Sequence, residues 1–327
     1  MRILITGSEG VLGSVLKAEL RKRGHEVFGC DLQHSDDSQV MRADISEHRQ
    51  LARVFKWCEP DLVYHFAAEF GRVNSETYWE QVWKTNCVGT RNVIEECLKP
   101  IRGIKPMLVF ASSSEAYGAA ELYSEGARLT ERMTDDFVPQ FHNEYSLSKY
   151  VNERQIHTAV RNHGLRAVIL RFFNVYGPPE IFTPFRSVVC QFIYQMLHNL
   201  PVVVNTGGYR SHLWIGDWCN TVACIPDRLS TLTNKSWWPG SKGALCTPVF
   251  NIGSEDMESI VTLYNRLADI IKPCSSSIYF LESEFANTPA RCPNTELARE
   301  WLDHNPKMNF QDGLEITVAA MRKQYGF

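Results

Sequence analysis

The amino-acid sequence lacks the features that mark several large classes of protein. Its 327 residues contain no apolar stretch of membrane-spanning length and no long basic run, so we expect neither a membrane span nor nucleic acid as the main partner. There is also no internal repeat and no low-complexity segment. No signal peptide precedes the first predicted strand, which predicts a cytoplasmic protein.

The sequence also lacks the spacings that are typical of metal sites. Its ten cysteines are spread along the chain without a C-x-x-C pair, and no histidine cluster has zinc spacing. Cys219 and Cys224 form the closest cysteine pair, and their spacing fits no common metal site. We therefore expect no metal, and we interpret most of the cysteines as reduced core residues.

The composition is that of an ordinary soluble globular protein. Hydrophobic residues make up 44% of the chain and charged residues 22%, with a formal net charge of -3. A chain of this length can bury a sizeable core, and it suits either two domains or one large α/β unit with an additional lobe.

The first thirteen residues predict a strand, a tight turn and a helix. Residues 2–6 are a short apolar run, and Gly7, Gly10 and Gly13 follow it before apolar residues at helical spacing. A helix N-terminus carries unpaired N–H groups and a partial positive charge, which attract a phosphate. Gly7 allows the sharp turn, Gly10 allows the backbone to approach a pyrophosphate, and Gly13 allows close packing of helix on strand. The junction therefore predicts a dinucleotide site.

The second strand predicts which dinucleotide binds. Residues 26–31 read as a strand that ends at Asp31, whose carboxylate can accept hydrogen bonds from both ribose hydroxyls and would repel the 2′-phosphate of NADP. Asp31 therefore favours NAD. Residues 42–45 predict a short third strand that places Asp44 beside the adenine, and Ser46 predicts the N-cap of a helix that ends at Trp57.

Buried-strand patterns then alternate with helical ones. Strands are predicted at residues 61–68, 107–111 and 166–176, with helices at 86–97 and 144–163. Such alternation is typical of an α/β fold with a doubly wound parallel sheet and helices on both faces. His65, within the first of these strands, is interpreted as a packed core histidine rather than a catalyst.

A glycine and two prolines at 177–179 predict the domain boundary. We assign residues 1–177 to the cofactor domain and 178–327 to a smaller substrate lobe, with segments near 205–220 and 249–256 returning to the first domain. The remaining predicted elements are helices at 185–199, 258–271, 294–303 and 311–324, strands at 202–204 and 250–253, and an exposed insertion at 227–248.

Tyr145 and Lys149 predict the chemistry. Four residues apart on the helix at 144–163, they share one face. A nearby ammonium and a positive nicotinamide ring would both favour the phenolate, and lowering the tyrosine pKa by ~3 units needs about 4 kcal/mol of differential interaction. The phenolate could then remove a hydroxyl proton while a hydride leaves the same carbon for NAD. Ser113, at a strand end, can hydrogen-bond the reacting oxygen.

These motifs together resemble the extended short-chain dehydrogenase/reductases, and among them the NAD-dependent nucleotide-sugar epimerases, dehydratases and decarboxylases. The resemblance covers nearly the whole chain. Besides Tyr145 and Lys149, it rests on residues 6–13, 65–68, 86–90, 112–118 and 171–178. It implies a Rossmann-type NAD domain, a small C-terminal lobe that holds a nucleoside-diphosphate sugar, and a homodimer.

Site residues follow from the motifs and the resemblance. The expected catalytic set is Ser113, Ser114, Glu115, Tyr145 and Lys149. Arg72, Asn174, Arg186, Arg210 and Arg291 are expected to bind the substrate, with Asn174 at its phosphate. The expected cofactor-binding set is Gly7, Glu9, Gly10, Val11, Gly13, Asp31, Asp44, Ile45, Phe66, Ala67, Ala68, Asn86, Ser112, Tyr145, Lys149 and Phe172.

The reaction that follows oxidation of the sugar, usually at C4, stays open between three outcomes. Resembling 4,6-dehydratases carry an Asp-Glu pair where this chain has Ser114 and Glu115, and the missing aspartate counts against dehydration. Serine-glutamate resembles the UDP-glucuronate decarboxylases, whereas a simple 4-epimerase needs no carboxylate there. Glu115 is interpreted either as a base at C5 or as a structural carboxylate bonded to backbone N–H groups.

We predict an epimerase or dehydratase, with epimerisation ahead and decarboxylation of a nucleotide-linked uronic acid as the alternative. A simple dehydrogenase that releases a keto sugar and a non-catalytic NAD-binding sensor are the remaining hypotheses. The retention of Ser113, Tyr145 and Lys149 counts against a sensor.

Overall fold

A parallel sheet forms the centre of the computed structural model, which describes residues 1–118, 128–136, 139–232, 247–282 and 291–327. The seven strands are paired in the order β12-β7-β5-β4-β1-β2-β3, and every pairing is parallel. Their bounds are Arg2–Thr6 (β1), Glu26–Asp31 (β2), Val40–Arg42 (β3), Leu62–His65 (β4), Met107–Ser113 (β5), Arg166–Phe172 (β7) and Val249–Ile252 (β12). The chain reverses its winding direction at β1 and β4, which opens a crevice at the carboxyl ends of the strands.

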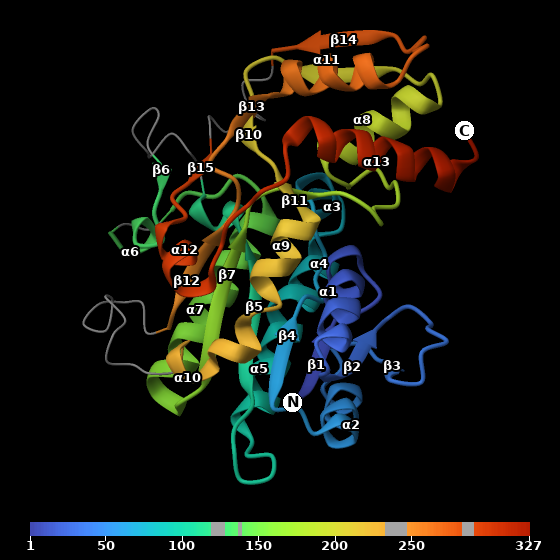
Figure 1. Ribbon diagram of the computed structural model, residues 1–327. Coiled ribbons are helices and arrows are strands. Elements are labelled where there is room, and N and C mark those ends of the chain that lie inside the picture. The colour runs from blue at the N-terminus through green and yellow to red at the C-terminus, as the bar shows by residue number, and fades with distance from the viewer. Residues whose placement is uncertain (119–127, 137–138, 233–246, 283–290) are drawn as a thin grey trace.

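Helices cover both faces of this sheet because the strands are apolar on both sides (Figure 1). On one face the core contains side chains of α1 (Val11–Lys22), α9 (Ile215–Val222), α10 (Leu229–Leu232) and α12 (Glu296–Leu302). On the other face it contains side chains of α2 (His48–Cys58), α5 (Thr90–Leu98) and α7 (Glu144–His163). His65 lies within this buried layer, where its ring contacts Thr6 Oγ1 at 2.7 Å and Thr90 Oγ1 at 3.0 Å.

A second, smaller core lies beyond the carboxyl ends of the strands, at the top of Figure 1. It is formed by α8 (Val188–Leu197), α11 (Ile260–Ile270) and α13 (Phe310–Tyr325), together with β9 (Val202–Asn205). β9 pairs in parallel with β14 (Ile278–Leu281). This lobe therefore faces the crevice of the parallel sheet.

Short elements connect the sheet to the lobe. Small paired strands are β6 (Arg128–Leu129) with β15 (Cys292–Pro293), β8 (Val175–Tyr176) with β11 (Leu213–Trp214), and β10 (Tyr209–Ser211) with β13 (Met257–Ser259). The other short elements are α3 (Arg72–Thr77), α4 (Trp79–Val82), the π-helix η1 (Trp83–Gly89), the 3-10 helices η2 (Ser114–Tyr117) and η4 (Ile225–Arg228), and α6 (Met133–Asp136).

The predicted fold class is confirmed, and β1, β2 and α7 have the predicted bounds. Three details were wrong. Ser46 does not cap α2, because its N–H and hydroxyl both donate to Asp44 Oδ1 in the preceding turn and Glu47 is the N-cap. The third strand ends at Arg42, where its register with β2 ends. β7 ends at Phe172 because Asn174 has a positive φ of 34°, which interrupts the extended chain.

None of the described helices has both the length and the apolar character needed to cross a bilayer. In the described part of the chain, nine cysteines are free and no group of acidic, histidine and cysteine side chains could hold a metal ion. The tenth cysteine, Cys246, and most of the predicted insertion at 227–248 lie outside the described residues.

Candidate active site

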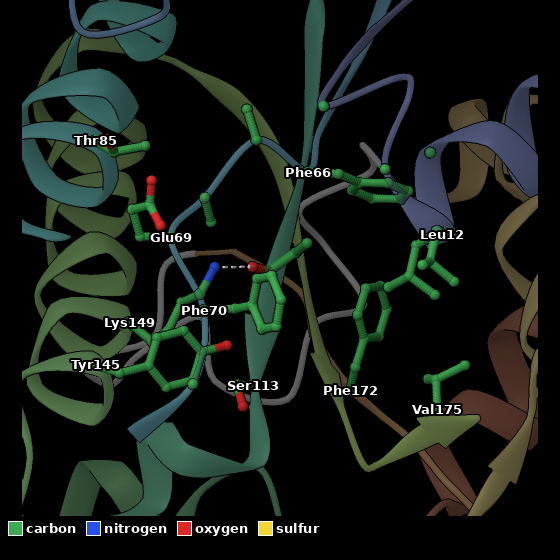
Figure 2. Close-up of a pocket in the computed structure, with 18 of the residues that line it drawn as sticks. Leu12, Phe66, Glu69, Phe70, Thr85, Ser113, Tyr145, Lys149, Phe172 and Val175 are labelled. Atoms are coloured by element: carbon green, nitrogen blue, oxygen red, sulfur yellow. Dashed lines mark hydrogen bonds between the residues drawn. The ribbon is translucent and has the colours of Figure 1, made fainter. Parts of the chain in front are cut away.

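A cavity of about 510 Å³ opens at the carboxyl ends of the central strands, next to the lobe. Figure 2 shows Ser113, Tyr145 and Lys149 on one wall and the apolar side chains of Leu12, Phe66, Phe172 and Val175 on the opposite wall. Most of the predicted site residues line it: Gly7, Gly10, Val11, Gly13, Asp31, Asp44, Ile45, Phe66, Ala67, Ala68, Arg72, Ser112, Ser113, Ser114, Glu115, Tyr145, Lys149, Phe172, Asn174 and Arg186.

The glycine loop has the shape that a pyrophosphate requires. A Cβ on Gly7 would lie 2.7 Å from Ala67 N, and one on Gly13 would lie 2.0 Å from Gly7 O, so both glycines are needed for packing within the protein. A Cβ on Gly10 would meet only Gly7 O, at 3.3 Å, and would otherwise occupy cavity space. Gly10 is also the N-cap of α1 and supplies no side-chain cap. The first turn of α1 can therefore receive an anion.

Asp31 is fixed at the far edge of the same cavity. Its Oδ2 accepts a hydrogen bond from the N–H of Glu9 at 2.9 Å, and its Oδ1 accepts one from the N–H of Gln33 at 3.0 Å. Each carboxylate oxygen has a further lone pair that can accept from a ribose hydroxyl. The loop and Asp31 together fit NAD, whose pyrophosphate would lie at α1 and whose adenosine ribose would lie at Asp31.

Tyr145 and Lys149 lie on the face of α7 that is directed toward β5. The Lys149 ammonium donates to Ala111 O at 2.8 Å and lies 5.8 Å from the centre of the Tyr145 ring. Ser113 hydrogen-bonds with the Tyr145 side chain and also accepts from the N–H of Glu115 at 3.2 Å. The predicted serine, tyrosine and lysine are therefore brought together at the cavity wall.

The protonation of this group differs from the expectation. Burial raises the pKa of Tyr145 to about 12, although hydrogen bonding with Ser113 opposes that change. Burial also lowers the pKa of Lys149 to about 8. Lys149 was expected to lower the tyrosine pKa, but its ammonium is directed to a carbonyl of β5 and not to the phenol. The nicotinamide ring of bound NAD would supply a further positive charge that favours the phenolate.

A buried ion pair holds α7 against the sheet. Glu153 lies on the same helix face as Tyr145 and Lys149, and both it and Arg171 of β7 are fully buried. Arg171 Nη2 donates to Glu153 Oε2 at 2.7 Å and Arg171 Nε to Oε1 at 2.9 Å. Ser112 Oγ donates to Glu153 Oε1 at 2.5 Å. This network fixes the rotation of α7 and hence the direction of Tyr145 and Lys149.

Glu115, which lines the cavity next to Ser113 and Ser114, is held by cationic side chains. Its Oε1 accepts from Arg72 Nη2 at 2.7 Å and lies 3.0 Å from Arg291 Nη1, while its Oε2 accepts from Ser146 Oγ at 2.8 Å. Burial alone would raise the pKa of Glu115, but the charges of Arg291 and Arg72 outweigh burial and lower it to about 2. The partners are thus arginine and serine side chains rather than the backbone N–H groups that one hypothesis named.

Three arginines of the described chain act on this carboxylate from different depths. Arg291 is buried and donates to Ser114 O at 3.0 Å and to Gly118 O at 2.5 Å, whereas the Arg72 side chain is 32% exposed. Burial lowers the pKa of Arg210 to about 10, and Arg72 and Arg291 act in the same direction. Two guanidinium groups therefore contact one carboxylate and the charge of Arg210 adds to theirs, so this wall favours an anionic ligand.

Four predicted site residues do not line the cavity. Glu9 pairs with Lys17 at 2.6 Å, on the side of the glycine loop away from it. Asn86 Nδ2 donates to Glu69 O and Ser148 Oγ, both at 3.0 Å, and so ties α7 to the segment after β4. Arg210 and Arg291 pair with each other in a β-bridge and are not among the lining residues. Their roles toward ligands stay predictions.

Other lining residues were missed by sequence reasoning. They are Leu12, Cys30, Leu32, Gln33, Ala43, Glu69, Phe70, Gly71, Thr85, Ala111, Val175, Glu180 and Ser187. Glu180 could have been found, since it directly follows the Gly177–Pro179 turn that ends the Asn174 motif. Ser146, the partner of Glu115, lies next to Tyr145 but belongs to no pattern that the sequence displays.

Comparisons with known proteins agree with this geometry. The model of the NAD dependent epimerase/dehydratase family matches residues 3–236. The chain is 25% identical to a UDP-N-acetyl-alpha-D-glucosaminuronate decarboxylase of Bacillus cytotoxicus, over 98% of both chains. It is 27% identical to UDP-glucuronate 4-epimerase 1 of Arabidopsis thaliana, over 99% of this chain and 77% of that one. The Thermus thermophilus UDP-glucose 4-epimerase in complex with NAD superposes with a TM-score of 0.82, at 23% identity, over 98% of this chain and 99% of that one.

Proposed function

The chain belongs to the NAD-dependent epimerase/dehydratase family, and we propose that it decarboxylates a nucleoside-diphosphate-linked hexuronic acid through a 4-keto intermediate. The observation that carries this proposal is the arrangement around Glu115, an ionised carboxylate clamped by Arg72 and Arg291 beside the Ser113–Tyr145 pair. The two relatives reported above, by their names, act on nucleotide-linked uronic acids.

Tyr145 is the residue proposed to accept the proton of the C4 hydroxyl. NAD, which the glycine loop and Asp31 would hold, would supply a hydride acceptor at C4 and the same hydride for the final reduction, so that there would be no net oxidation. Ser113 would hydrogen-bond the same oxygen, as its contact with Tyr145 allows. Lys149 would hold α7 in its position against β5 through its hydrogen bond to Ala111 O.

The ketone at C4 makes the carboxylate at C6 a leaving group. Carbon dioxide leaves when the C5–C6 bond breaks, and the electron pair of that bond moves to C5 and O4 as an enolate. The protonated Tyr145 and Ser113 are placed to stabilise O4. A proton then adds to C5, and the hydride returns to C4. The products are carbon dioxide and a nucleotide-linked pentose.

Glu115 distinguishes this proposal from dehydration. A dehydratase needs a base that removes the C5 proton, but a carboxylate whose pKa is about 2 is a weak base, and both of its oxygens already accept hydrogen bonds. By the family resemblance, Glu115 faces C5. There its fixed negative charge would repel the C6 carboxylate of the substrate, and loss of carbon dioxide relieves that repulsion.

Epimerisation at C4 is the second candidate. The identity with UDP-glucuronate 4-epimerase 1 favours it, and so do the guanidinium groups of Arg72 and Arg291, because a cation that pairs with the C6 carboxylate retains it. In that reaction the keto sugar would rotate and accept the hydride on its other face.

Incubation of the NAD-loaded protein with UDP-glucuronic acid, followed by mass spectrometry, tests both candidates. Decarboxylation predicts a product lighter by carbon dioxide. An unchanged mass with an inverted C4 signal in the NMR spectrum would indicate epimerisation. Intact UDP-glucuronic acid in a panel where a neutral nucleotide hexose is converted would contradict the uronic acid as substrate.

We further propose that the chain is a homodimer in the cytoplasm, as the resemblance implies. η1 packs against α7, which covers one face of the sheet, and Val88 of η1 is 51% exposed. Light scattering that gives the mass of a single chain would contradict the dimer.

A further inference from the structure

A buried carboxyl group lies on the substrate side of the cavity and has no part in the proposed reaction. Glu180 follows the Gly177–Pro179 turn and is 6% exposed. It lines the cavity together with Asn174 and Arg186, which are both expected to bind the substrate. An acidic side chain is unexpected among residues that must hold a phosphate.

The Glu180 carboxyl is fixed at the start of α8. Ser187, the N-cap of α8, donates its hydroxyl to Glu180 Oε2 at 3.1 Å and accepts from the N–H of Cys190 at 3.2 Å. The N–H of Glu180 donates to Gly177 O at 3.4 Å. This anchoring leaves the carboxyl little freedom to turn away from the cavity.

No cation of the described chain forms an ion pair with Glu180. The charge of Arg186 acts on it, but the Arg186 guanidinium lies 4.7 Å from the centre of the Phe70 ring, and its Nε donates to Ile181 O at 3.2 Å. On α8, burial raises the pKa of the Cys190 thiol to about 12, so the thiol is neutral. Burial is also the main reason that the pKa of Glu180 is raised to about 7.

Across the cavity, the nearest charged lining groups have partners of their own. Arg72 is paired with Glu115, and Glu69 accepts a hydrogen bond from Asn74 Nδ2 at 3.1 Å. The charge state of Glu180 is therefore set by its own burial and by Arg186, and a ligand in the cavity would change it.

We propose that Glu180 is a specificity-determining residue that admits the substrate only as the neutral acid, in which form it donates a hydrogen bond to the substrate. This inference rests on the proposed function, because a nucleoside-diphosphate uronate brings negative charge into the cavity. A second ionised carboxylate in a wall of low dielectric would repel it, whereas the protonated form supplies a donor. Binding is thereby coupled to uptake of a proton at Glu180.

Titration calorimetry with UDP-glucuronic acid tests this coupling, because the charges of that probe do not titrate from about pH 6 to about pH 8. Every protein is loaded with NAD and carries Tyr145→Phe, so that turnover does not contribute to the heat, and the protein with no further change is called unmodified here. We expect the Kd of the unmodified protein to rise by up to about tenfold per pH unit above neutrality. Repeating the titration in buffers of different ionisation enthalpy should show uptake of up to about one proton. Glu180→Gln, which is neutral and still accepts from Ser187, should abolish both effects and keep the Kd of low pH.

Glu131→Gln provides the matched control. Glu131 is also a buried glutamate whose pKa is raised by burial, but it contacts Asn251 N and does not line the cavity. This variant should retain the proton uptake of the unmodified protein.

A purely structural role of Glu180 at α8 predicts identical proton uptake in the unmodified protein and in Glu180→Gln, and that result would overturn the inference. Binding is measured in the Tyr145→Phe background, so a failure of the protein with Tyr145 to release carbon dioxide contradicts the proposed function and leaves this measurement intact. Absence of binding at every pH would overturn both.

Discussion

The two sides of the cavity are built on different principles. The cofactor side is formed by backbone that is nearly continuous in sequence, namely the Gly7–Gly13 turn and the residues that end β2 and β4. On the substrate side, Arg72, Arg291 and Ser146 reach Glu115 from three segments that are far apart in sequence. The cofactor side is therefore fixed by packing, since a Cβ on Gly13 would lie only 2.0 Å from Gly7 O. The substrate side is fixed by a balance of charges.

Substitution of Tyr145, which lies between the cofactor side and the substrate side, should have the largest effect on turnover. Tyr145→Phe removes the proposed base and should lower turnover by about a thousandfold, in the range of general base catalysis. Affinity for NAD should not change, because the glycine loop and Asp31 remain. Steady-state assays and a cofactor titration measure the two quantities. Tyr150→Phe on the same helix, whose ring lies 5.1 Å from that of Phe141 at an interplanar angle of 43°, is the control. Normal turnover of Tyr145→Phe would refute the assignment of the base.

A change on the cofactor side should affect the cofactor alone. Asp31→Ala removes two acceptors for the ribose and should weaken NAD by about 10- to 100-fold, since a hydrogen bond to a charged group contributes about 1.5–3 kcal/mol. The same change should narrow the preference for NAD over NADP, because the charge that repels the 2′-phosphate is lost. Fluorescence titration with each cofactor measures this. Asp36→Ala, a fully exposed neighbour, should bind NAD normally. An equal loss of NAD affinity in both variants would contradict the assignment of Asp31 to the ribose.

The contrast also explains what could be predicted from the sequence. β1, β2 and α7 could be predicted to the residue because the sequence marks their ends: Gly7 follows β1, Asp31 ends β2, and Asn143 and Gly164 cap α7. Most of the cofactor site followed for the same reason, as a short motif contains both the turn and the helix start.

The substrate side could be predicted only as a list of residues. Arg72, Glu115 and Arg291 were all named, but no spacing shows that two guanidinium groups converge on one carboxylate oxygen. That convergence depends on β15 and α3, which are distant in sequence. It also depresses the pKa of Glu115, which sequence reasoning left open as a base.

Arg72 is expected to recognise the charge of the substrate, and its effect should be smaller than that of Asp31. Arg72→Ala should weaken the binding of UDP-glucuronic acid by about tenfold and that of UDP-glucose much less. The Arg72 side chain is 32% exposed, so a C6 carboxylate can reach its guanidinium. Calorimetry with both nucleotide sugars measures the difference. Arg91→Ala, on the exposed side of α5, should bind both as before. Equal weakening of both sugars would mean that Arg72 acts only through Glu115.

The smallest effect is expected from Ser146→Ala, and its pH dependence separates a fixed charge from a base at position 115. The Ser146 hydroxyl donates to Glu115 Oε2 at 2.8 Å and to Asn143 Oδ1 at 2.9 Å. Its loss should raise the pKa of Glu115 from about 2, but the two arginines remain, so the carboxylate stays ionised throughout the neutral range. A carboxylate with a lowered pKa loses its charge only when the pH falls toward that pKa. The ionisation of Glu115 should therefore not affect the turnover of either protein from about pH 5 to about pH 7. The variant should be only about two- to threefold slower, because the Glu115 carboxylate is held less firmly. If turnover of Ser146→Ala instead fell with decreasing pH across that interval, Glu115 would be titrating as a base, and the substrate side would work by proton transfer rather than by fixed charge.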